Sequence, residues 1–210
     1  MSHRSIPLDK IKGLYASNVT ENGVKSTAVG WNSAESQAMR FDKLTSVIQD
    51  HSGPVSVNDY GCGYGAHLEY LVKTRGIQVS AYGGYDLSEE MLAAARSELS
   101  WFSGDLSLFC SSEISTKVDY TFVSGTFNVK FDADDCVWQE FIEKKLDEID
   151  YHSRCGFSFN LLTTHVDWKE EHLFYGDPCY WFNLCKRKYS RRVVLLHDYP
   201  LYEWTIVVRK

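Results

Sequence analysis

The chain has 210 residues, of which 44% are hydrophobic and 24% charged, a composition that supports a packed domain and excludes wholesale disorder. The formal net charge of -6 argues against a broad nucleic-acid surface, which is normally basic. No segment has the apolar length of a transmembrane helix and no signal peptide is visible, so we expect a cytoplasmic protein with reduced cysteines. None of the six cysteines forms a C-x-x-C pair, so no metal site is predicted.

Residues 1–30 are mostly polar and are interpreted as an N-terminal arm in front of a domain at residues 31–210. Asn32, followed three residues later by Glu35, predicts the start of a helix. Apolar side chains then recur on one helical face until a breaker at residues 51–54, His-Ser-Gly-Pro.

Beyond this breaker, short apolar strands alternate with helices. The predicted strands are 55–59, 77–85, 118–123, 156–163, 193–197 and 204–208, and the predicted helices are 66–74, 88–96 and one from about residue 134. This alternation implies a largely parallel sheet with helices on both faces. Only about six residues join the last two strands, too few for a helical crossover, so these strands should pair antiparallel.

A glycine-rich loop, Asp-Tyr-Gly-Cys-Gly-Tyr-Gly at residues 59–65, lies between the first of these strands and the next helix. Glycines permit tight turns and let a ligand approach the backbone. In an open parallel sheet, ligands bind beyond the carboxyl ends of the strands. Asp86 ends the second strand, 21 residues past Gly65, where a carboxylate can accept the hydroxyl groups of a ribose.

Two nucleoside cofactors fit such a loop. Gly61, Gly63 and Ala66 satisfy the dinucleotide pattern G-x-G-x-x-A. Asp59, however, would repel a pyrophosphate, whereas it would attract the ammonium of an amino acid. S-adenosylmethionine (SAM) carries an ammonium and no phosphate. The residues therefore favour SAM, with a dinucleotide and dehydrogenase chemistry as the minor alternative.

These residues resemble the class I SAM-dependent methyltransferases. Residues 59–65 are similar to the first motif of that family, residues 85–92 to the second, residues 104–106 to the third and residues 119–128 to the fourth. The resemblance implies an α/β, Rossmann-like fold with a seven-stranded, mostly parallel sheet whose last strand is antiparallel, preceded by a helical arm. It also implies that the chain is an enzyme with SAM as methyl donor.

The resemblance also implies roles for single residues. Gly61 and Gly63 would line the methionine part of SAM, Asp86 would hold the ribose, and Met91 and Asp105 would contact the adenine. The full set of residues expected to bind the cofactor is Trp31, Arg40, Asp59, Gly61, Cys62, Gly63, Asp86, Leu87, Met91, Gly104, Asp105, Leu106 and Ser124.

Arg40 is part of a segment, residues 31–44, that resembles one in a subgroup of small bacterial methyltransferases. It sits at the edge of the apolar helix face and could bind the carboxylate of SAM through a charge-assisted hydrogen bond. The alternative is an ion pair with Asp42 or Glu35 on the same helix.

Methyl transfer uses an activated donor, so a general base is needed only if the acceptor must lose a proton. Residues 160–180, rich in aromatic and ionisable side chains, are predicted to form the acceptor wall. His165 is the first candidate for a catalytic base and His197 the second, although lone histidines more often have a structural role.

We expect a small-molecule acceptor that is methylated on an oxygen or nitrogen atom. Methylation of RNA or protein is the alternative, and a non-enzymatic SAM-binding module is a third. The basic residues at 186–192 would favour RNA if they lay near the pocket; otherwise we interpret them as a solvated turn.

Overall fold

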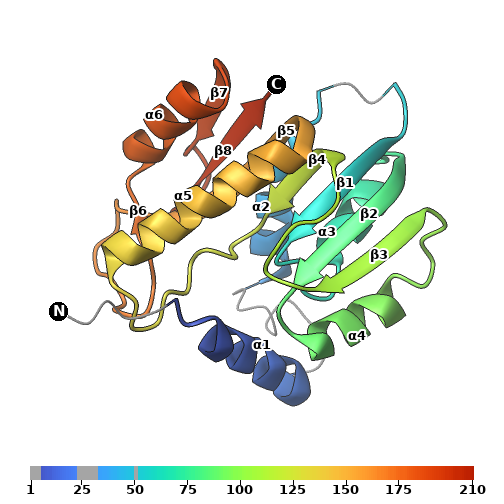
Figure 1. The fold of residues 1–210 in the computed structure, drawn as a ribbon, viewed down its shortest axis with the longest axis horizontal. Helices are drawn as coiled ribbons and strands as arrows, with labels where there is room; N and C mark the ends of the chain where they lie inside the picture. The colour runs from blue at the N-terminus through green and yellow to red at the C-terminus, as the bar shows by residue number, and fades with distance from the viewer. Residues whose placement is uncertain (1–5, 23–32, 50–51) are drawn as a thin grey trace.

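One sheet forms the centre of the protein (Figure 1). The computed structural model describes residues 6–22, 33–49 and 52–210. The strands are β1 (Val55–Tyr60), β2 (Val79–Asp86), β3 (Asp105–Cys110), β4 (Val118–Val123), β5 (Ser153–Thr163), β6 (Tyr175–Gly176), β7 (Arg192–Leu196) and β8 (Glu203–Arg209). Seven of them follow the order β3-β2-β1-β4-β5-β8-β7, and the short β6 pairs with β5.

The direction of the strands agrees with the prediction. Strands β1 to β5 pair in parallel, whereas β8 is antiparallel to both of its neighbours, β5 and β7. The predicted α/β class, with its mostly parallel sheet and antiparallel last strand, is therefore confirmed. All parallel strands end at one edge of the sheet, which we call the carboxyl edge.

Helices cover both faces of the sheet. They are α1 (Leu8–Asn22), α2 (Ala34–Thr45), α3 (Ala66–Glu69) with its π-helical continuation η2 (Tyr70–Thr74), α4 (Glu89–Glu98), α5 (Asp135–His152) and α6 (Pro178–Lys188). One hydrophobic cluster joins α5 and α6 to the sheet, and a second joins α2, α3 and α4 to the opposite face. Figure 1 shows α1 below this sandwich, next to the ends of β1 and β2.

Two helix starts show how local sequence sets the boundaries. Ser88 caps α4 as predicted, because its hydroxyl accepts a hydrogen bond from the amide of Met91. The cap of α2 is Ser33, whose hydroxyl accepts from the amide of Ser36. The predicted cap, Asn32, was therefore one residue too early, and it lies outside the described residues. Helix α2 also ends at Thr45, before the predicted breaker.

The sequence prediction missed β3 and α6. Most side chains of β3 are only partly buried, so the strand has neither a continuous apolar run nor a clean alternation. Helix α6 starts at a recognisable signal, because Asp177 caps it and Pro178 occupies its first turn. Lys186 to Lys188 form the last turn of α6, where cations suit the helix dipole, so the interpretation of these residues as a loop is corrected.

Candidate active site

The glycine loop after β1 folds back against the end of β2. The amides of Gly61 and Cys62 both donate to the carbonyl of Tyr85, at 2.8 and 3.0 Å. Gly61, Gly63 and Gly65 all have positive φ angles, which glycine adopts without strain. These contacts fix a tight turn whose backbone is open to a ligand.

Gly61 is needed for a second reason. A Cβ atom at this position would lie 2.1 Å from the hydroxyl oxygen of Thr126, a distance that real atoms do not share. Thr126 itself is held in place, because its hydroxyl donates to the carbonyl of Tyr60 at 2.8 Å. The glycine loop and the turn after β4 therefore touch, and only a residue without a side chain fits between them.

Asp86 ends β2 and is held by the backbone on both sides. One carboxylate oxygen accepts from the amide of Gly63 and the other from the amide of Ser88, each at 2.9 Å. Burial raises the pKa of Asp86, and these amide donors oppose the shift. Each oxygen keeps a second lone pair, so the carboxylate can still accept hydrogen bonds from a bound ligand.

Asp59 lies at the floor of the same site. Its Oδ2 accepts from the hydroxyl of Tyr82 at 2.9 Å, whereas its Oδ1 is buried and has no hydrogen-bond partner among the described residues. Burial, the largest cause, raises the pKa of Asp59 to about 7. A buried acceptor without a partner is costly, so this oxygen is suited to a cationic ligand.

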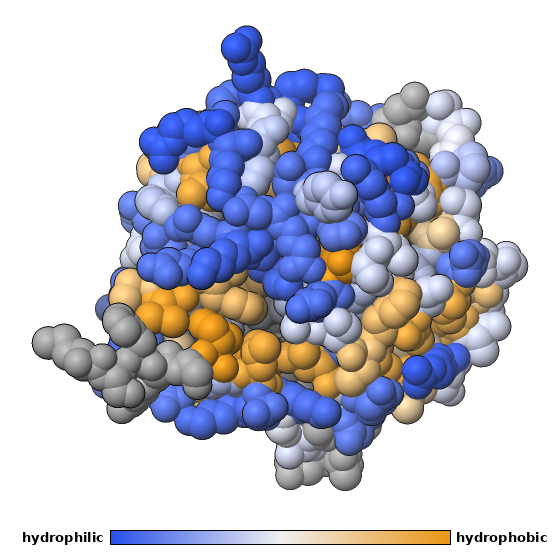
Figure 2. All heavy atoms as spheres, viewed as in Figure 1, coloured by the Kyte–Doolittle hydropathy of each residue, from blue (hydrophilic) through white to orange (hydrophobic). Residues whose placement is uncertain are grey.

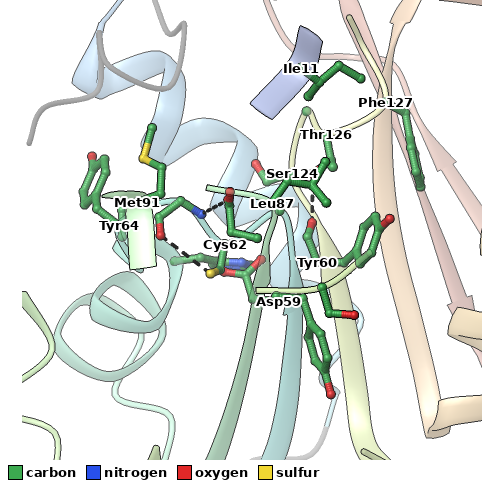
Figure 3. A pocket seen from close by; sticks show the side chains of 18 of the residues that line it. Ile11, Asp59, Tyr60, Cys62, Tyr64, Leu87, Met91, Ser124, Thr126 and Phe127 are labelled. Atoms are coloured by element: carbon green, nitrogen blue, oxygen red, sulfur yellow. Dashed lines mark hydrogen bonds between the residues drawn. The ribbon is translucent and has the colours of Figure 1, made fainter. Parts of the chain in front are cut away.

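A pocket opens above these residues at the carboxyl edge of the sheet (Figure 3). Its empty space, including the open mouth, is about 960 Å³. Eight of the predicted cofactor residues line it: Asp59, Gly61, Cys62, Gly63, Asp86, Leu87, Met91 and Ser124.

Arg40, one of the other predicted residues, lies away from the pocket. Its guanidinium forms a buried ion pair with Glu203, with 2.7 Å between Nε and Oε2. This partner is neither of the two expected on the same helix, since Asp42 instead contacts Arg75. Trp31 lies outside the described residues.

Gly104, Asp105 and Leu106 are also remote, because β3 begins at Asp105 and reaches the carboxyl edge only at Cys110. Asp105 pairs with Ala81 near the start of β2, at the edge of the sheet opposite the pocket. The adenine contact predicted for Asp105 is therefore dropped. The residue that follows the other end of β3, Ser111, lines the pocket and was missed.

The two candidate catalytic histidines come together, but outside the pocket. The rings of His165 and His197 are 5.8 Å apart, and both side chains are exposed. Partial burial and the neighbouring His165 lower the pKa of His197. No residue of the predicted acceptor wall, 160–180, lines the pocket, so that wall is corrected as well.

Other segments complete the pocket, and sequence reasoning did not assign them to it. They are Leu8 and Ile11 of α1, Gln37 and Phe41 of α2, Ala66 and His67 of α3, the turn at Gly125, Thr126 and Phe127, and Trp138 and Phe141 of α5, together with Tyr60, Tyr64 and Tyr85. Gln37 and Phe41 lie four residues apart on the apolar face of α2, a spacing that could have indicated a shared wall.

His67 is the one pocket histidine among the described residues, and it is neutral. Its ring stacks on Phe41 with 4.5 Å between the ring centroids, and burial lowers its pKa to about 3. In the part of the chain that the structure describes, no group of three or more His, Cys, Asp or Glu side chains could hold a metal ion. No helix within the described ranges is both long and apolar enough to cross a membrane.

Comparison with known proteins agrees with this geometry. No family model matches the chain. The Mycobacterium tuberculosis protein named "Putative methyltransferase Rv1506c" is 46% identical over 167 residues, which cover 78% of this chain and 98% of that protein. Such identity over nearly the whole relative shows a common family.

Solved structures share the fold at low identity. Magnesium protoporphyrin IX methyltransferase from Synechocystis PCC 6803, solved with bound SAM, has a TM-score of 0.68 at 12% identity and covers 100% of both chains. DhpI, solved as a complex with SAM and HEP, has a TM-score of 0.68 at 13% identity and covers 99% of this chain and 100% of its own. With the sheet order, the glycine loop and the close relative, these findings show that the chain belongs to the class I SAM-dependent methyltransferases.

Proposed function

We propose that this enzyme binds SAM across the carboxyl ends of β1 and β2 and methylates an oxygen or nitrogen atom of a small-molecule acceptor. The observation that carries the proposal is the buried Oδ1 of Asp59, a residue that lines the pocket, because this oxygen has no hydrogen-bond partner among the described residues. The ammonium of SAM would supply the missing donor. A phosphate-bearing dinucleotide would place negative charge against this carboxylate instead.

The other contacts follow from the same placement. Asp86, held by the amides of Gly63 and Ser88, would accept the ribose hydroxyl groups. Leu87 and Met91 supply apolar surface for the adenine, and Ser111 follows the neighbouring strand end. SAM brings an already activated methyl group when it is bound. The protein has to align the acceptor with that group and keep water away.

The apolar and aromatic lining of the pocket supports a small acceptor over RNA. The basic residues that would favour RNA are at the end of α6 and the start of β7. Arg192 begins β7 and pairs with Arg209, which in turn pairs with Gly156 near the start of β5. The basic cluster therefore lies at the edge of the sheet opposite the pocket.

Calorimetry with SAM and with S-adenosylhomocysteine tests the cofactor site. We expect Asp86→Ala and Asp59→Asn to weaken binding on the order of tenfold or more, because each removes a charge-assisted contact. Asp105→Asn is the matched control, since Asp105 is an exposed aspartate at the far edge of the sheet. Equal binding by all three variants would contradict the proposed site.

The acceptor class is tested with SAM that carries a tritiated methyl group. The enzyme is incubated with the dialysable and the non-dialysable fractions of a cell extract. We expect label to enter the dialysable fraction. Label that appears in material sensitive to ribonuclease or protease would contradict a small-molecule acceptor, and absence of transfer would favour a non-enzymatic SAM-binding module.

A further inference from the structure

The pocket is lined by more residues than those assigned to SAM. On the side of α5, five further side chains line it: Leu8, Ile11, Phe127, Trp138 and Phe141. We call the part of the pocket that these five side chains line the acceptor chamber. All five are apolar or aromatic, and they come from α1, from the turn after β4 and from α5.

From this chamber we infer that the acceptor is a hydrophobic molecule with an aromatic or alkyl body, rather than a sugar or another polyhydroxylated compound. The inference rests on the proposed function, because it assigns the acceptor half of the same pocket.

The aromatic wall of the chamber is built from α5 and the turn. The rings of Phe127 and Phe141 meet edge to face with 6.4 Å between their centroids, and Trp138 lies 5.1 Å from Phe141. The indole N–H of Trp138 donates to the carbonyl of Phe127 at 2.9 Å. The one polar atom of the indole is therefore already used, so this wall offers an apolar surface to a ligand.

The first helix adjoins this aromatic wall. Ile11 is only 8% exposed and belongs to the same hydrophobic cluster as Phe127 and Trp138. Figure 3 shows Ile11 on the side of the pocket occupied by Thr126 and Phe127. Outside the pocket, Lys10 of α1 forms an ion pair with Asp132, just before α5, at 2.7 Å. This ion pair joins α1 to the segment before α5 at the surface.

Polar groups next to the chamber are mostly occupied within the protein. The hydroxyl of Tyr60 donates to the carbonyl of Ser112 at 3.2 Å, and that of Thr126 donates to Tyr60. The hydroxyl of Ser111 donates to the carbonyl of Glu113. The proton of each of these hydroxyl groups is already donated within the protein, so they offer a sugar only acceptor lone pairs. Each sugar oxygen left without a donor costs binding free energy.

Ser124 differs from these residues. Its hydroxyl oxygen is buried and has no hydrogen-bond partner among the described residues, and the residue lines the pocket beside the glycine loop. Although Ser124 was predicted as a cofactor residue, we assign its unused hydroxyl to the oxygen or nitrogen atom that receives the methyl group. Apolar walls with one available polar group are the usual composition of a site for a hydrophobic ligand with a single polar end.

The protein surface next to the acceptor chamber is also apolar. Figure 2 shows a hydrophobic band along α1, where this helix meets the body of the protein. Ile6 and Leu8 are partly buried hydrophobic residues that pack against the core at this end of α1. An apolar acceptor would thus meet apolar surface before it reaches the pocket.

The test uses 4-methylphenol, 4-ethylphenol and 4-propylphenol as probes of the enzyme loaded with S-adenosylhomocysteine, measured by calorimetry. Because burial of one methylene favours binding by a factor of about three to four, we expect the dissociation constant to fall by that factor at each step. Ile11→Ala and Phe141→Ala should weaken this dependence and leave the affinity for S-adenosylhomocysteine unchanged.

Two matched controls come from the same helices. Leu14 on α1 is 36% exposed and Tyr151 on α5 is 69% exposed, and neither lines the pocket. Leu14→Ala and Tyr151→Ala should keep the dependence of the intact enzyme. Equal dependence in all four variants would overturn the assignment of the chamber.

The outcome separates this inference from the function on which it rests. If S-adenosylhomocysteine binds but the phenols do not, or bind with constants independent of chain length, the hydrophobic acceptor is overturned and the cofactor site stands. Tighter binding of methyl glucoside than of propylphenol would also overturn the hydrophobic acceptor alone. Failure of S-adenosylhomocysteine to bind would overturn both.

Discussion

Arg40 and Glu203 form a buried ion pair between α2 and β8, with 2.7 Å between Nε and Oε2. Burial raises the pKa of Glu203, and the guanidinium of Arg40 opposes this shift. On the neighbouring strand β5, the side-chain oxygen of Asn160 accepts from the amide of Gly125, at 2.7 Å, in the turn that borders the pocket. Helix α2 and the turn after β4 are therefore each held by one of two adjacent strands.

Arg40→Ala should destabilise the fold by about 3 to 5 kcal/mol, because it leaves the carboxylate of Glu203 buried without its cation. Urea denaturation measures this loss. Arg75→Ala is the control: its ion pair with Asp42 is partly exposed and should contribute at most about 1 kcal/mol. The double variant Arg40→Met/Glu203→Leu should recover most of the stability, and equal losses for the two single variants would contradict this account.

Gly61→Ala should prevent normal closure of the cofactor loop. The added methyl group would collide with Thr126, and φ at position 61 is +80°. We expect a large loss of both stability and SAM affinity, measured by thermal denaturation and calorimetry. Removing the Thr126 side chain in Gly61→Ala/Thr126→Ala should restore part of the loss and leave the backbone strain of about 1–2 kcal/mol.

Gly76→Ala isolates that backbone strain, because Gly76 has φ +65° and no atom within 4 Å of its added Cβ. This variant should be less stable by only the backbone strain energy, and it should bind SAM as tightly as the natural protein. If Gly61→Ala behaved like Gly76→Ala, contact with Thr126 would not be the cause.

SAM affinity should rise with pH. The pKa of Asp59 is about 7 in the free protein, so the carboxyl is mostly protonated at pH 6 and mostly ionised at pH 8. An ammonium needs the ionised form, so binding should tighten about fivefold from pH 6 to pH 7 and take place with release of a proton below pH 7. Above pH 7 the α-amino group of SAM begins to lose its own proton, and the rise in affinity should level off. Calorimetry in buffers of different ionisation enthalpy counts that proton. Asp59→Asn should bind more weakly and lose this part of the pH dependence.

The same carboxyl should lower stability at high pH. Its folded pKa of about 7 lies above its unfolded value near 3.8, so the folded state binds the proton more tightly. The contribution of this carboxyl to the free energy of unfolding is fully present below about pH 4. It is lost as the pH rises toward 7, and the loss is at most about 4 kcal/mol. Asp59→Asn should thus be more stable than the natural protein at pH 8, without SAM, and nearly equal to it at pH 4. A stability difference independent of pH would contradict the raised pKa.

Sequence patterns predicted the parts of the fold that depend on neighbouring residues. The apolar runs of β4 and β8 and the cap at Ser88 are local signals, and the structure places all three where they were expected. Strand β3 was not predicted, because its partly exposed side chains show no clear period. Without this strand, the sequence could not show that Asp105 begins β3 and that Ser111 follows its carboxyl end in the pocket.

The two halves of the pocket also differ in how far the sequence could predict them. The proposed cofactor half lies mainly in two short segments, 59–65 and 86–91, which a motif can describe. The proposed acceptor half combines Ile11, Phe127 and Phe141, which are far apart in the sequence and carry no pattern beyond being apolar. Only the folded chain brings them together, and for this reason the acceptor wall was predicted at residues 160–180.

Helix α1 packs against α4, and this contact determines the order in which the protein can be assembled on the ribosome. Asn22 ends α1 and Glu89 begins α4, a separation of 67 positions (89 minus 22). At ordinary rates of translation, about 3 to 13 s pass between the end of α1 synthesis and the start of α4 synthesis. A nascent chain thus makes the glycine loop and both strands beside it before α1 can dock on α4.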